Sequence, residues 1–532
     1  MILPEVPERA LDELGRTEGG AETLGLLVRD QHTRRLLLLR AVLDAVEAAD
    51  PALCSTAAKG RLREDWALLV AADRAERDVR RGEGRDVHGV SGLPPDPGGE
   101  PGNAAPDGPV VRSVGPGVGA DSTPYEGTIP PGAAGLSLPP VRALLLHPFV
   151  GPWARSCLRG LGAGGRERDP RELRRDLAYF GALAAVAAAR AAVPYAVRLT
   201  ARDGVLTLPS LGALRTAAPG DAPVDVVHRR QSLTLRQPGS GEKGIVVRLQ
   251  SGGIGAWSDA AAWTPAHALP GLLPGAAPVP LDDLDPYRTS RGGPGPHTLS
   301  GPVTLDDAER KHWLQSWAGI ATVLRQGGEQ RVTEAAALLR CVVPLSAPPG
   351  STPGGRTTGS CSGTRREAFG AVLSSPPPTP TSFAATLVHE LQHTKLAALS
   401  NMMTLHHASS QARYFAPWRP DPRPYDGLLQ GAYSHLALAD FFQRRALDTP
   451  HLTHRDFAWA QYARYQEQVG AVLPTLVGSG DLTVQGRRFV DQMVAVYERL
   501  AENPAPRGQA ARAEAYVRAA RALWTQRHAP TE

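Results

Sequence analysis

The stretch Ser382-Phe-Ala-Ala-Thr-Leu-Val-His-Glu-Leu-Gln-His-Thr-Lys-Leu-Ala-Ala-Leu-Ser-Asn-Met-Met403 contains neither proline nor glycine and carries the motif His389-Glu390-Leu-Gln-His393. Its alanines and leucines favour a helix. Positions four apart on a helix differ by about 40° around the axis, so both imidazoles can point the same way. Two such imidazoles can bind one metal ion, and Glu390 can reach a metal-bound water. The stretch therefore predicts a buried helix with a metal site.

Two histidines rarely complete a metal site, so we expect a third ligand. The compact metzincin pattern needs glycine and histidine where this chain has Leu396 and Leu399, which excludes that class. We prefer His435, because it falls on the apolar stripe of a helix predicted over residues 427–447. Taken alone, such a histidine is more often a core residue bonded to a backbone carbonyl. The other candidates are His406, His407, Asp426 and Asp440.

Two segments that flank the motif could complete a cleft. The proline-rich segment 414–425 predicts a rigid loop, in which Arg419 and Arg423 could present their guanidinium groups to a carboxylate beside the metal. Surface arginines in a connector are an equally good interpretation of each. The strand predicted over residues 367–373 could line the cleft as an edge strand and bind an extended peptide.

Composition excludes several other classes. The chain has 532 residues and a formal net charge of +5, with no basic block, which disfavours nucleic-acid binding. Its four cysteines lie far apart without a C-x-x-C pair, which suggests a reducing cytoplasm. The first residues do not resemble a secretion signal. The longest apolar run, residues 177–193, is too short and too weakly apolar to cross a membrane.

The chain divides into four predicted regions. Residues 1–81 form a helical segment, and residues 82–140 form a Gly/Pro-rich linker or insertion that we expect to be disordered. Residues 141–345 form an α+β region, and residues 346–532 form a mainly helical, gluzincin-like region that holds the motif. The fold class is α+β, dominated by helices, with an antiparallel β module in the middle.

Periodicity and turn residues place the elements of these regions. The predicted helices are residues 22–50, 62–79, 144–159, 171–192, 306–326 and 332–340, with mostly helical chain after 382. The predicted strands are residues 196–199, 205–208, 224–228, 233–236, 245–249, 341–345 and 368–373.

A longer set of segments surrounds the motif. They are Arg366-Glu-Ala-Phe-Gly-Ala-Val372, Leu387-Val-His-Glu-Leu-Gln-His-Thr-Lys-Leu396, Ala416-Pro-Trp-Arg-Pro-Asp-Pro-Arg-Pro424, Gly427-Leu-Leu-Gln-Gly-Ala-Tyr-Ser-His435, His147-Pro-Phe-Val-Gly-Pro-Trp153 and Leu281-Asp-Asp-Leu-Asp-Pro-Tyr287. This set resembles the HEXXH-motif domain family, whose members stand alone or are fused to radical-SAM peptide maturases in actinobacterial clusters for ribosomally made peptides. The resemblance covers roughly residues 141–532.

The resemblance implies an iron(II)- and 2-oxoglutarate-dependent β-hydroxylase that acts on a precursor peptide, together with a radical-SAM maturase of the same cluster as a possible partner. It implies that His389, His393 and His435 hold the iron. Arg419 or Arg423 would then pair with the distal carboxylate of 2-oxoglutarate.

The resemblance leaves two positions near the motif open. Glu390 could orient a ligand, bind substrate or complete a facial-type site. Some relatives have histidine where this chain has Gln430.

Two other functions fit the same residues. A gluzincin-type zinc metallopeptidase would use Glu390 as general base toward zinc-bound water. Imidazoles suit both iron and zinc, so the ligands alone do not choose between the metals. A non-catalytic peptide-binding protein with a vestigial site is disfavoured, because a decayed site would have lost a ligand.

Overall fold

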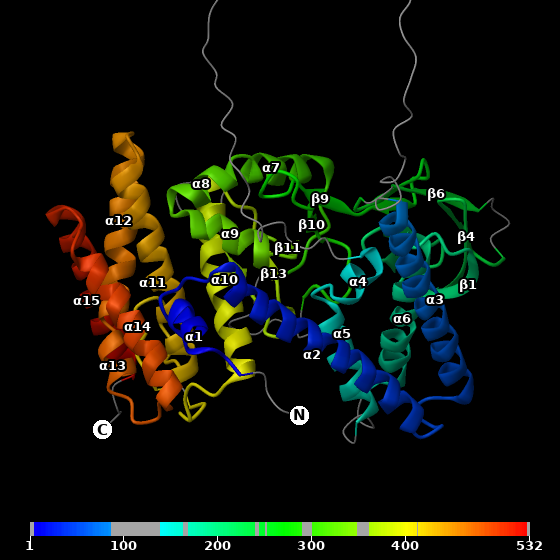
Figure 1. Cartoon of the computed structure of the whole chain (residues 1–532), viewed down its shortest axis with the longest axis horizontal. Helices are drawn as coiled ribbons and strands as arrows, with labels where there is room; N and C mark the ends of the chain where they lie inside the picture. Colours follow the sequence, from blue (N-terminus) through cyan, green and yellow to red (C-terminus); the bar gives the residue numbers. More distant parts are fainter. Residues whose placement is uncertain are drawn as a thin grey trace, which may run out of the picture.

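The computed structural model describes residues 5–86, 139–162, 169–239, 244–250, 253–289, 301–347, 361–411 and 413–528. Long helices make up most of this part of the chain, and its strands fall in the middle of the sequence, between Tyr195 and Ser374. Figure 1 shows the strands of residues 195–257 at the right edge of the molecule and those of residues 267–374 near its centre. The predicted class, α+β with helices dominant, is therefore confirmed. Most of the predicted linker, residues 87–138, lies outside the described residues, whereas residues 82–86 continue α3 (Thr56–Asp86).

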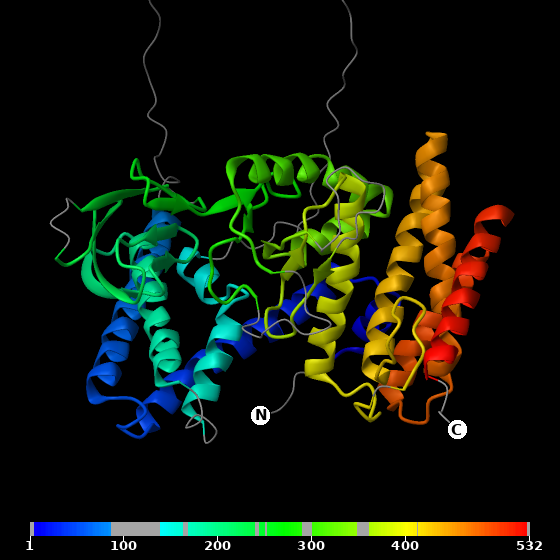
Figure 2. The same ribbon diagram turned by 180° about the vertical axis from the view of Figure 1, so that it is seen from behind.

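Two hydrophobic cores organise the molecule. The first lies among the C-terminal helices and includes α1 (Glu8–Gly15), and the second lies between helices near the N-terminus and the β module. Helix α2 (Ala21–Ala48) joins them, because Leu24 belongs to the first core and Val42 to the second. Figures 1 and 2 show α2 running obliquely from one half of the molecule to the other.

The helices of the second core lie about where the sequence predicts them, with one exception. Helix α6 (Pro170–Arg190) begins where Asp169 accepts a hydrogen bond from the Arg171 amide at 2.8 Å. The single helix predicted over residues 144–159 is wrong, since it is split into α4 (Pro140–Leu145) and α5 (Val150–Leu161). The break coincides with His147-Pro148, and proline both lacks an amide hydrogen and disfavours helical geometry in the residue before it.

The β module contains two antiparallel sheets. In one, the strand order is β1 (Tyr195–Ala201), β4 (Ala222–Arg229), β5 (Ser232–Arg236), β6 (Ile245–Leu249) and β7 (Ala256–Trp257). In the other, it is β2 (Val205–Leu208), β3 (Gly212–Arg215) and β8 (Trp263–Pro265).

The predicted antiparallel module is confirmed by these sheets, although the short strands β3, β7 and β8 were missed. Strand β3 begins at Gly212, whose φ is +152°. A Cβ atom there would lie 2.4 Å from the Thr264 carbonyl oxygen, so the strand needs a glycine.

A third sheet connects the two cores. Its order is β12 (Ser362–Gly363), β13 (Ala371–Ser374), β11 (Cys341–Pro344), β10 (Val279–Leu281) and β9 (His267–Leu269), and β10, β11 and β13 are parallel. Val342 and Val372 belong to the first core, whereas Val343 and Leu373 belong to the second. The side chains thus alternate between the two faces of the sheet.

The strand predicted over residues 367–373 is present as β13, but its predicted position at the edge of a sheet is wrong. Strand β13 is hydrogen-bonded to β12 on one side and to β11 on the other, and all its residues are buried. The proposed addition of a peptide to this strand therefore lacks a free edge. Strands β11 and β13 also flank the predicted boundary between residues 345 and 346, which stays a prediction.

Three shorter helices cover the first core beside this sheet. They are α7 (Asp307–Trp317), α8 (Ile320–Gln326) and α9 (Glu329–Leu338). The single helix predicted over residues 306–326 is interrupted at Ala318-Gly319, where Gly319 has a φ of +80° that favours glycine.

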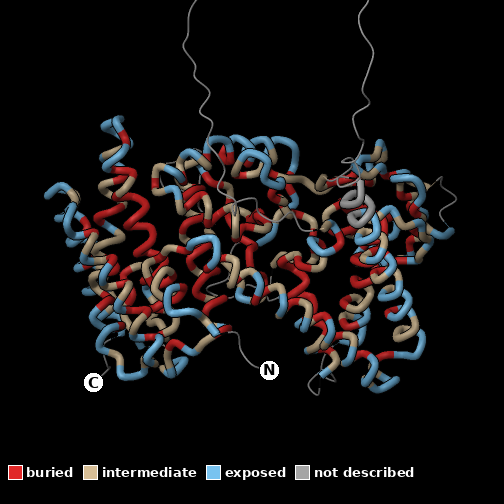
Figure 3. The backbone as a smooth tube through the Cα atoms, viewed as in Figure 1, coloured by how far each residue is buried: buried red, intermediate tan, exposed pale blue. Residues whose placement is uncertain are grey.

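The C-terminal region is a stack of helices, as predicted. They are α10 (Pro380–Met402), α11 (Tyr425–Asp448), α12 (Leu452–Gly470), α13 (Leu473–Val477), α14 (Val484–Ala501) and α15 (Arg507–His528). Figure 3 shows that α10 and α11 are buried along much of their length, whereas the outer helices expose one face. No helix among the described residues is both long enough and apolar enough to cross a membrane.

Candidate metal centre

Helix α10 begins with a capping box and carries the motif in its middle. Thr379 Oγ1 accepts a hydrogen bond from the Ser382 amide, Ser382 Oγ accepts one from the Thr379 amide, and Pro380 occupies the first turn. These signals fix the start of the helix, so His389 and His393 lie one turn apart in its central part.

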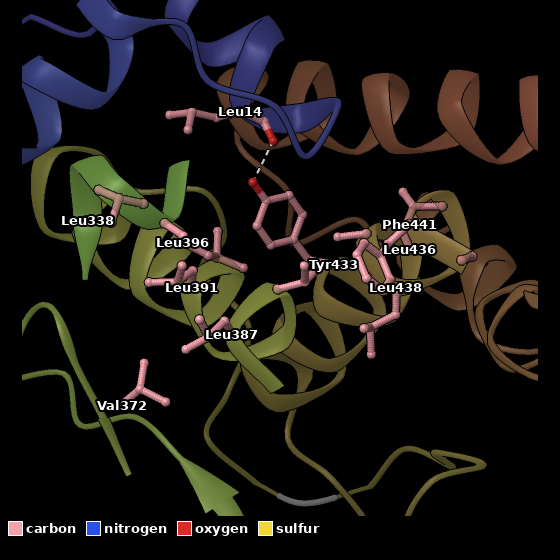
Figure 4. Close-up of a cluster of buried hydrophobic side chains, with 14 of the residues drawn as sticks. Leu14, Leu338, Val372, Leu387, Leu391, Leu396, Tyr433, Leu436, Leu438 and Phe441 are labelled. Atoms are coloured by element: carbon pink, nitrogen blue, oxygen red, sulfur yellow. Dashed lines mark hydrogen bonds between the residues drawn. The ribbon is translucent and has the colours of Figure 1, made fainter. Parts of the chain in front are cut away.

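Apolar packing holds α10 against α11. Leu387, Leu391 and Leu396 lie in one cluster with Tyr433 of α11 (Figure 4). The Tyr433 hydroxyl donates a hydrogen bond of 2.6 Å to the backbone oxygen of Leu14, which ties α11 to α1. The N-terminal segment therefore supports the two helices that carry the candidate ligands.

The two histidines of the motif face each other. Their Nε2 atoms are 3.0 Å apart, and their ring centroids are 4.7 Å apart. Gln430 Oε1 of α11 lies 3.2 Å from His393 Nδ1, so a proton on Nδ1 would bond Gln430, while His393 Nε2 is directed at His389 Nε2. Burial lowers the pKa of His393, and it lowers that of His389 well below its usual value with added repulsion from His393 and His435. Both rings are therefore neutral, as metal ligands must be.

Glu390 turns toward β12 instead of joining the pair. Ser362 Oγ donates a hydrogen bond of 2.7 Å to Glu390 Oε1, and the Thr364 hydroxyl also bonds the carboxyl group. Oε1 lies 4.0 Å from His389 Nε2, whereas Oε2 is buried without a hydrogen-bond partner among the described residues. Burial raises the pKa of Glu390 to about 7.

His435 lies beside the pair on the buried face of α11. Its ring centroid is 5.5 Å from that of His389, and Trp418 and Tyr465 pack on it at 4.5 and 5.2 Å. Burial lowers its pKa to about 3. Within the described ranges, no three His, Cys, Asp or Glu side chains are grouped so that they could hold one ion together. His435 is thus a neighbour of the pair, and its role as third ligand stays a prediction.

Gly431 explains the close approach of Trp418 to this helix. A Cβ atom at Gly431 would lie 2.4 Å from the Trp418 ring. The glycine therefore lets the proline-rich loop pack directly against α11, one turn before His435.

The other candidate ligands have different partners. His406 Nε2 lies 3.7 Å from Asp426 Oδ1, and Asp426 also pairs with Arg366. His407 is exposed. Asp440 is buried among arginines and forms an ion pair of 3.0 Å with Arg331. These four residues, His406, His407, Asp426 and Asp440, are not brought together with the histidine pair as ligands.

The two arginines of the proline-rich loop differ in position. Arg423 is partly buried, and its positive charge contributes to the lowered pKa of His393. Its Nε atom is buried without a hydrogen-bond partner among the described residues, and its Nη1 lies 3.6 Å from Asp421. Arg419 is exposed. Arg423 is therefore the better placed of the two for a ligand at the histidine pair.

A buried charge network lies behind the motif on the same helix. Lys395 Nζ donates to Glu334 Oε1 at 2.8 Å and to the Thr17 carbonyl at 3.0 Å. Arg331 pairs with Glu334 at 3.2 Å and with Asp440 at 3.0 Å. These contacts fix α10 against α9, α11 and the α1–α2 connection.

Sequence reasoning missed the residues that orient the motif. Ser362 and Thr364 lie in a Gly/Ser/Thr-rich segment without periodicity, so nothing in the sequence joins them to Glu390. Gln430 stands on the same helix as His435, yet only the packing of α10 on α11 brings it to His393.

No protein-family model matches this chain, and no curated protein does.

Proposed function

We propose that the histidine pair of α10 binds a divalent metal ion, and that the protein is an iron(II)- and 2-oxoglutarate-dependent β-hydroxylase of a precursor peptide. The carrying observation is the 3.0 Å separation of His389 Nε2 and His393 Nε2 on a buried helix. Metal–imidazole bonds are about 2.0–2.1 Å long, so two nitrogens that share one ion are less than about 4.2 Å apart. The pair satisfies this limit.

The surroundings of the pair also fit a metal. Gln430 would set the tautomer of His393 in the way that outer partners of metal-bound histidines do. His435 Nδ1 is buried without a described hydrogen-bond partner, so no bond at that atom opposes a turn of the ring toward the pair. We take His435 as the third ligand on this basis.

The cosubstrate would bind through Arg423. A guanidinium group with an unpartnered Nε atom, close enough to affect His393, suits the distal carboxylate of 2-oxoglutarate. When bound, iron(II) with 2-oxoglutarate and dioxygen supplies the oxidising power that replaces a hydrogen on a Cβ atom by hydroxyl. The protein would position the peptide, keep both imidazoles neutral and limit the access of water through the apolar wall of Trp418 and Tyr465.

The cellular setting follows from the same proposal. The precursor peptide and a radical-SAM maturase would be the partners. All four cysteines are free, in agreement with a reducing cytoplasm.

A gluzincin-like zinc metallopeptidase is the alternative, and one observation favours it. Glu390 Oε2 has no hydrogen-bond partner among the described residues, and Oε1 lies 4.0 Å from His389 Nε2, where the carboxyl group could act as general base for a metal-bound water.

A single incubation separates the two functions. The purified protein is mixed in air with iron(II), ascorbate, 2-oxoglutarate and the precursor peptide encoded beside its gene. We expect a mass gain of one oxygen atom and release of succinate. Formation of shorter peptide products without 2-oxoglutarate would contradict this proposal and would assign the protein to the metallopeptidases instead.

Matched arginine variants test the cosubstrate site. Arg423→Met is expected to raise the KM for 2-oxoglutarate at least about tenfold, because it removes a charge-assisted pair. Arg419→Met, in the same loop but exposed, is the control and should leave KM unchanged. Equal KM values in both variants would contradict the assignment of Arg423.

A further inference from the structure

A second cluster of polar groups lies in a cavity of the other half of the molecule. The cavity lies at the junction of the β module and the third sheet, and its walls come from residues 207–210, 266–267 and 280–285, together with His147, Gly212 and Ile254. It joins two segments that the sequence analysis singled out, 147–153 and 281–287, and that the proposed function does not use.

Three aspartates line this cavity, and one of them has an unsatisfied oxygen. Asp283 is 1 % exposed, and its Oδ1 atom has no hydrogen-bond partner among the described residues. His267 Nε2 is likewise buried without a described partner. His147 Nε2 lies 3.8 Å from Asp282 Oδ2. Buried polar atoms of this kind cost free energy unless a ligand or water satisfies them.

The positive charge around these carboxylates is limited. Arg288 acts on Asp282 and Asp285, while Tyr179 and the Tyr287 amide donate hydrogen bonds to Asp285. Burial raises the pKa of all three aspartates, that of Asp285 to about 7. A cation in the cavity would bind the Asp283 Oδ1 atom that lacks a described partner and would favour the ionised form of these carboxyl groups.

The size and the walls of the cavity restrict the cation. The cavity has a volume of about 30 Å³, which holds only a few waters, since each needs roughly 10–15 Å³. An ammonium group is about as large as a water, whereas a metal ion needs several ligands that converge on one point, and no three His, Cys, Asp or Glu side chains of the described residues are grouped in that way. The side chains of Leu208, Pro209, Ile254 and Leu284 supply apolar walls along which an alkyl chain can lie.

We propose that this cavity binds an aliphatic primary ammonium group, supplied by a lysine side chain of a peptide or by a free small amine. The site does not depend on a metal at the histidine pair. Arg365 donates to the carbonyl of Tyr287, two residues after Asp285 of the cavity wall, at 2.8 Å, and Ser362 of the same segment donates to Glu390.

Isothermal titration calorimetry of the full chain with three probes tests the proposal. Nα-acetyl-lysine amide represents a peptide lysine, pentylamine represents a free amine, and Nα-acetyl-norleucine amide lacks the ammonium group. We expect the lysine amide to bind and the norleucine amide to bind at least about tenfold more weakly. Stronger binding of pentylamine than of the lysine amide would assign the site to free amines. Equal binding of the lysine and norleucine probes would overturn the proposal.

Variants locate the binding. Asp283→Asn keeps an oxygen that can accept the hydrogen bond of the Leu305 amide, but it removes the negative charge. It should therefore weaken the binding of Nα-acetyl-lysine amide at least about tenfold. Ala266→Leu narrows the cavity without changing its charge and should have a similar effect. Asp259→Asn, exposed in the same module, is the control and should bind like wild type.

Thermal unfolding of each variant verifies that it is folded. Unchanged affinity in both folded cavity variants, or displacement of lysine amide by stoichiometric Mg²⁺, would contradict the ammonium site.

Discussion

The C-terminal helices and the region around the β module both bury acidic side chains, but different groups bind the carboxylate oxygens. In the C-terminal half, Glu334 and Asp440 meet the cations of Lys395 and Arg331. In the other half, Asp176 accepts hydrogen bonds from the hydroxyls of Tyr287 at 2.7 Å and Ser156 at 2.6 Å. The nearest charged nitrogen of Arg202 lies 3.9 Å from Asp176 Oδ1.

This difference has a consequence for ligands. In the C-terminal half, opposite charges are in fixed contact and satisfy each other. This network therefore supports α10 rigidly on the side away from the motif. Hydroxyl donors satisfy a carboxylate without cancelling its charge, so the neighbouring carboxylates keep the ability to attract a cation. We therefore expect the C-terminal network to contribute mainly to stability and the second region to contribute to binding.

The largest expected loss of stability follows from replacing Arg331, which pairs with both Glu334 and Asp440. Arg331→Met leaves Glu334 and Asp440 buried with one cation fewer, and breaking a buried ion pair in this way costs about 3–5 kcal/mol. Urea unfolding monitored by circular dichroism measures the change. Arg325→Met is the control. Arg325 and Glu329 are both exposed and lie 3.6 Å apart, so this substitution should lower the free energy of unfolding by less than about 1 kcal/mol.

A smaller loss of stability is expected where a hydroxyl group satisfies the buried carboxylate. Tyr287→Phe removes one donor from Asp176 and should lower the free energy of unfolding by about 1–3 kcal/mol. The exposed Tyr516→Phe serves as control and should stay within about 0.5 kcal/mol of wild type. A cost for Tyr287→Phe as large as that of Arg331→Met would remove the distinction between the two regions.

The smallest effect concerns pH and His147. Burial, followed by repulsion from Arg35, lowers the pKa of His147 to about 3 from its usual 6.5. The unfolded chain therefore binds more protons between these values, so the contribution of this group to stability falls as the pH drops below 6.5. Between pH 6.5 and pH 5 the loss is about 1–2 kcal/mol.

The measurement is the difference between wild type and His147→Gln in unfolding free energy across this pH range. That difference should change in the stated direction, since the wild type alone carries the buried imidazole. The exposed His454→Gln should show a curve parallel to wild type. A pH-independent difference for His147→Gln would mean that the ring is not held neutral by burial.

The sequence predicted the parts of the fold that rest on local patterns. The start of α10, the facing of His389 and His393, and most strands of the β module follow from capping, helical spacing and turns. Local reasoning failed where a single residue breaks a periodic pattern, as at Pro148 and Gly319.

Long-range pairing accounts for what could not be predicted. The position of β13 inside a sheet depends on β11, which is separated from it by a segment without periodicity. The contact of Ser362 with Glu390 and the meeting of His147 with Asp282 likewise join distant positions that share no spacing rule. Such contacts become visible only after the layers are assembled.

The most direct test of the account is the metal content of the protein after reconstitution with iron(II) or zinc(II) and removal of free ions, measured by mass spectrometry of the element. We expect about one equivalent per chain in wild type and in His407→Ala, a near-complete loss in His389→Ala and His393→Ala, and a strong decrease in His435→Ala. Folded wild type without bound metal, or unchanged content in the His389 and His393 variants, would contradict the central claim.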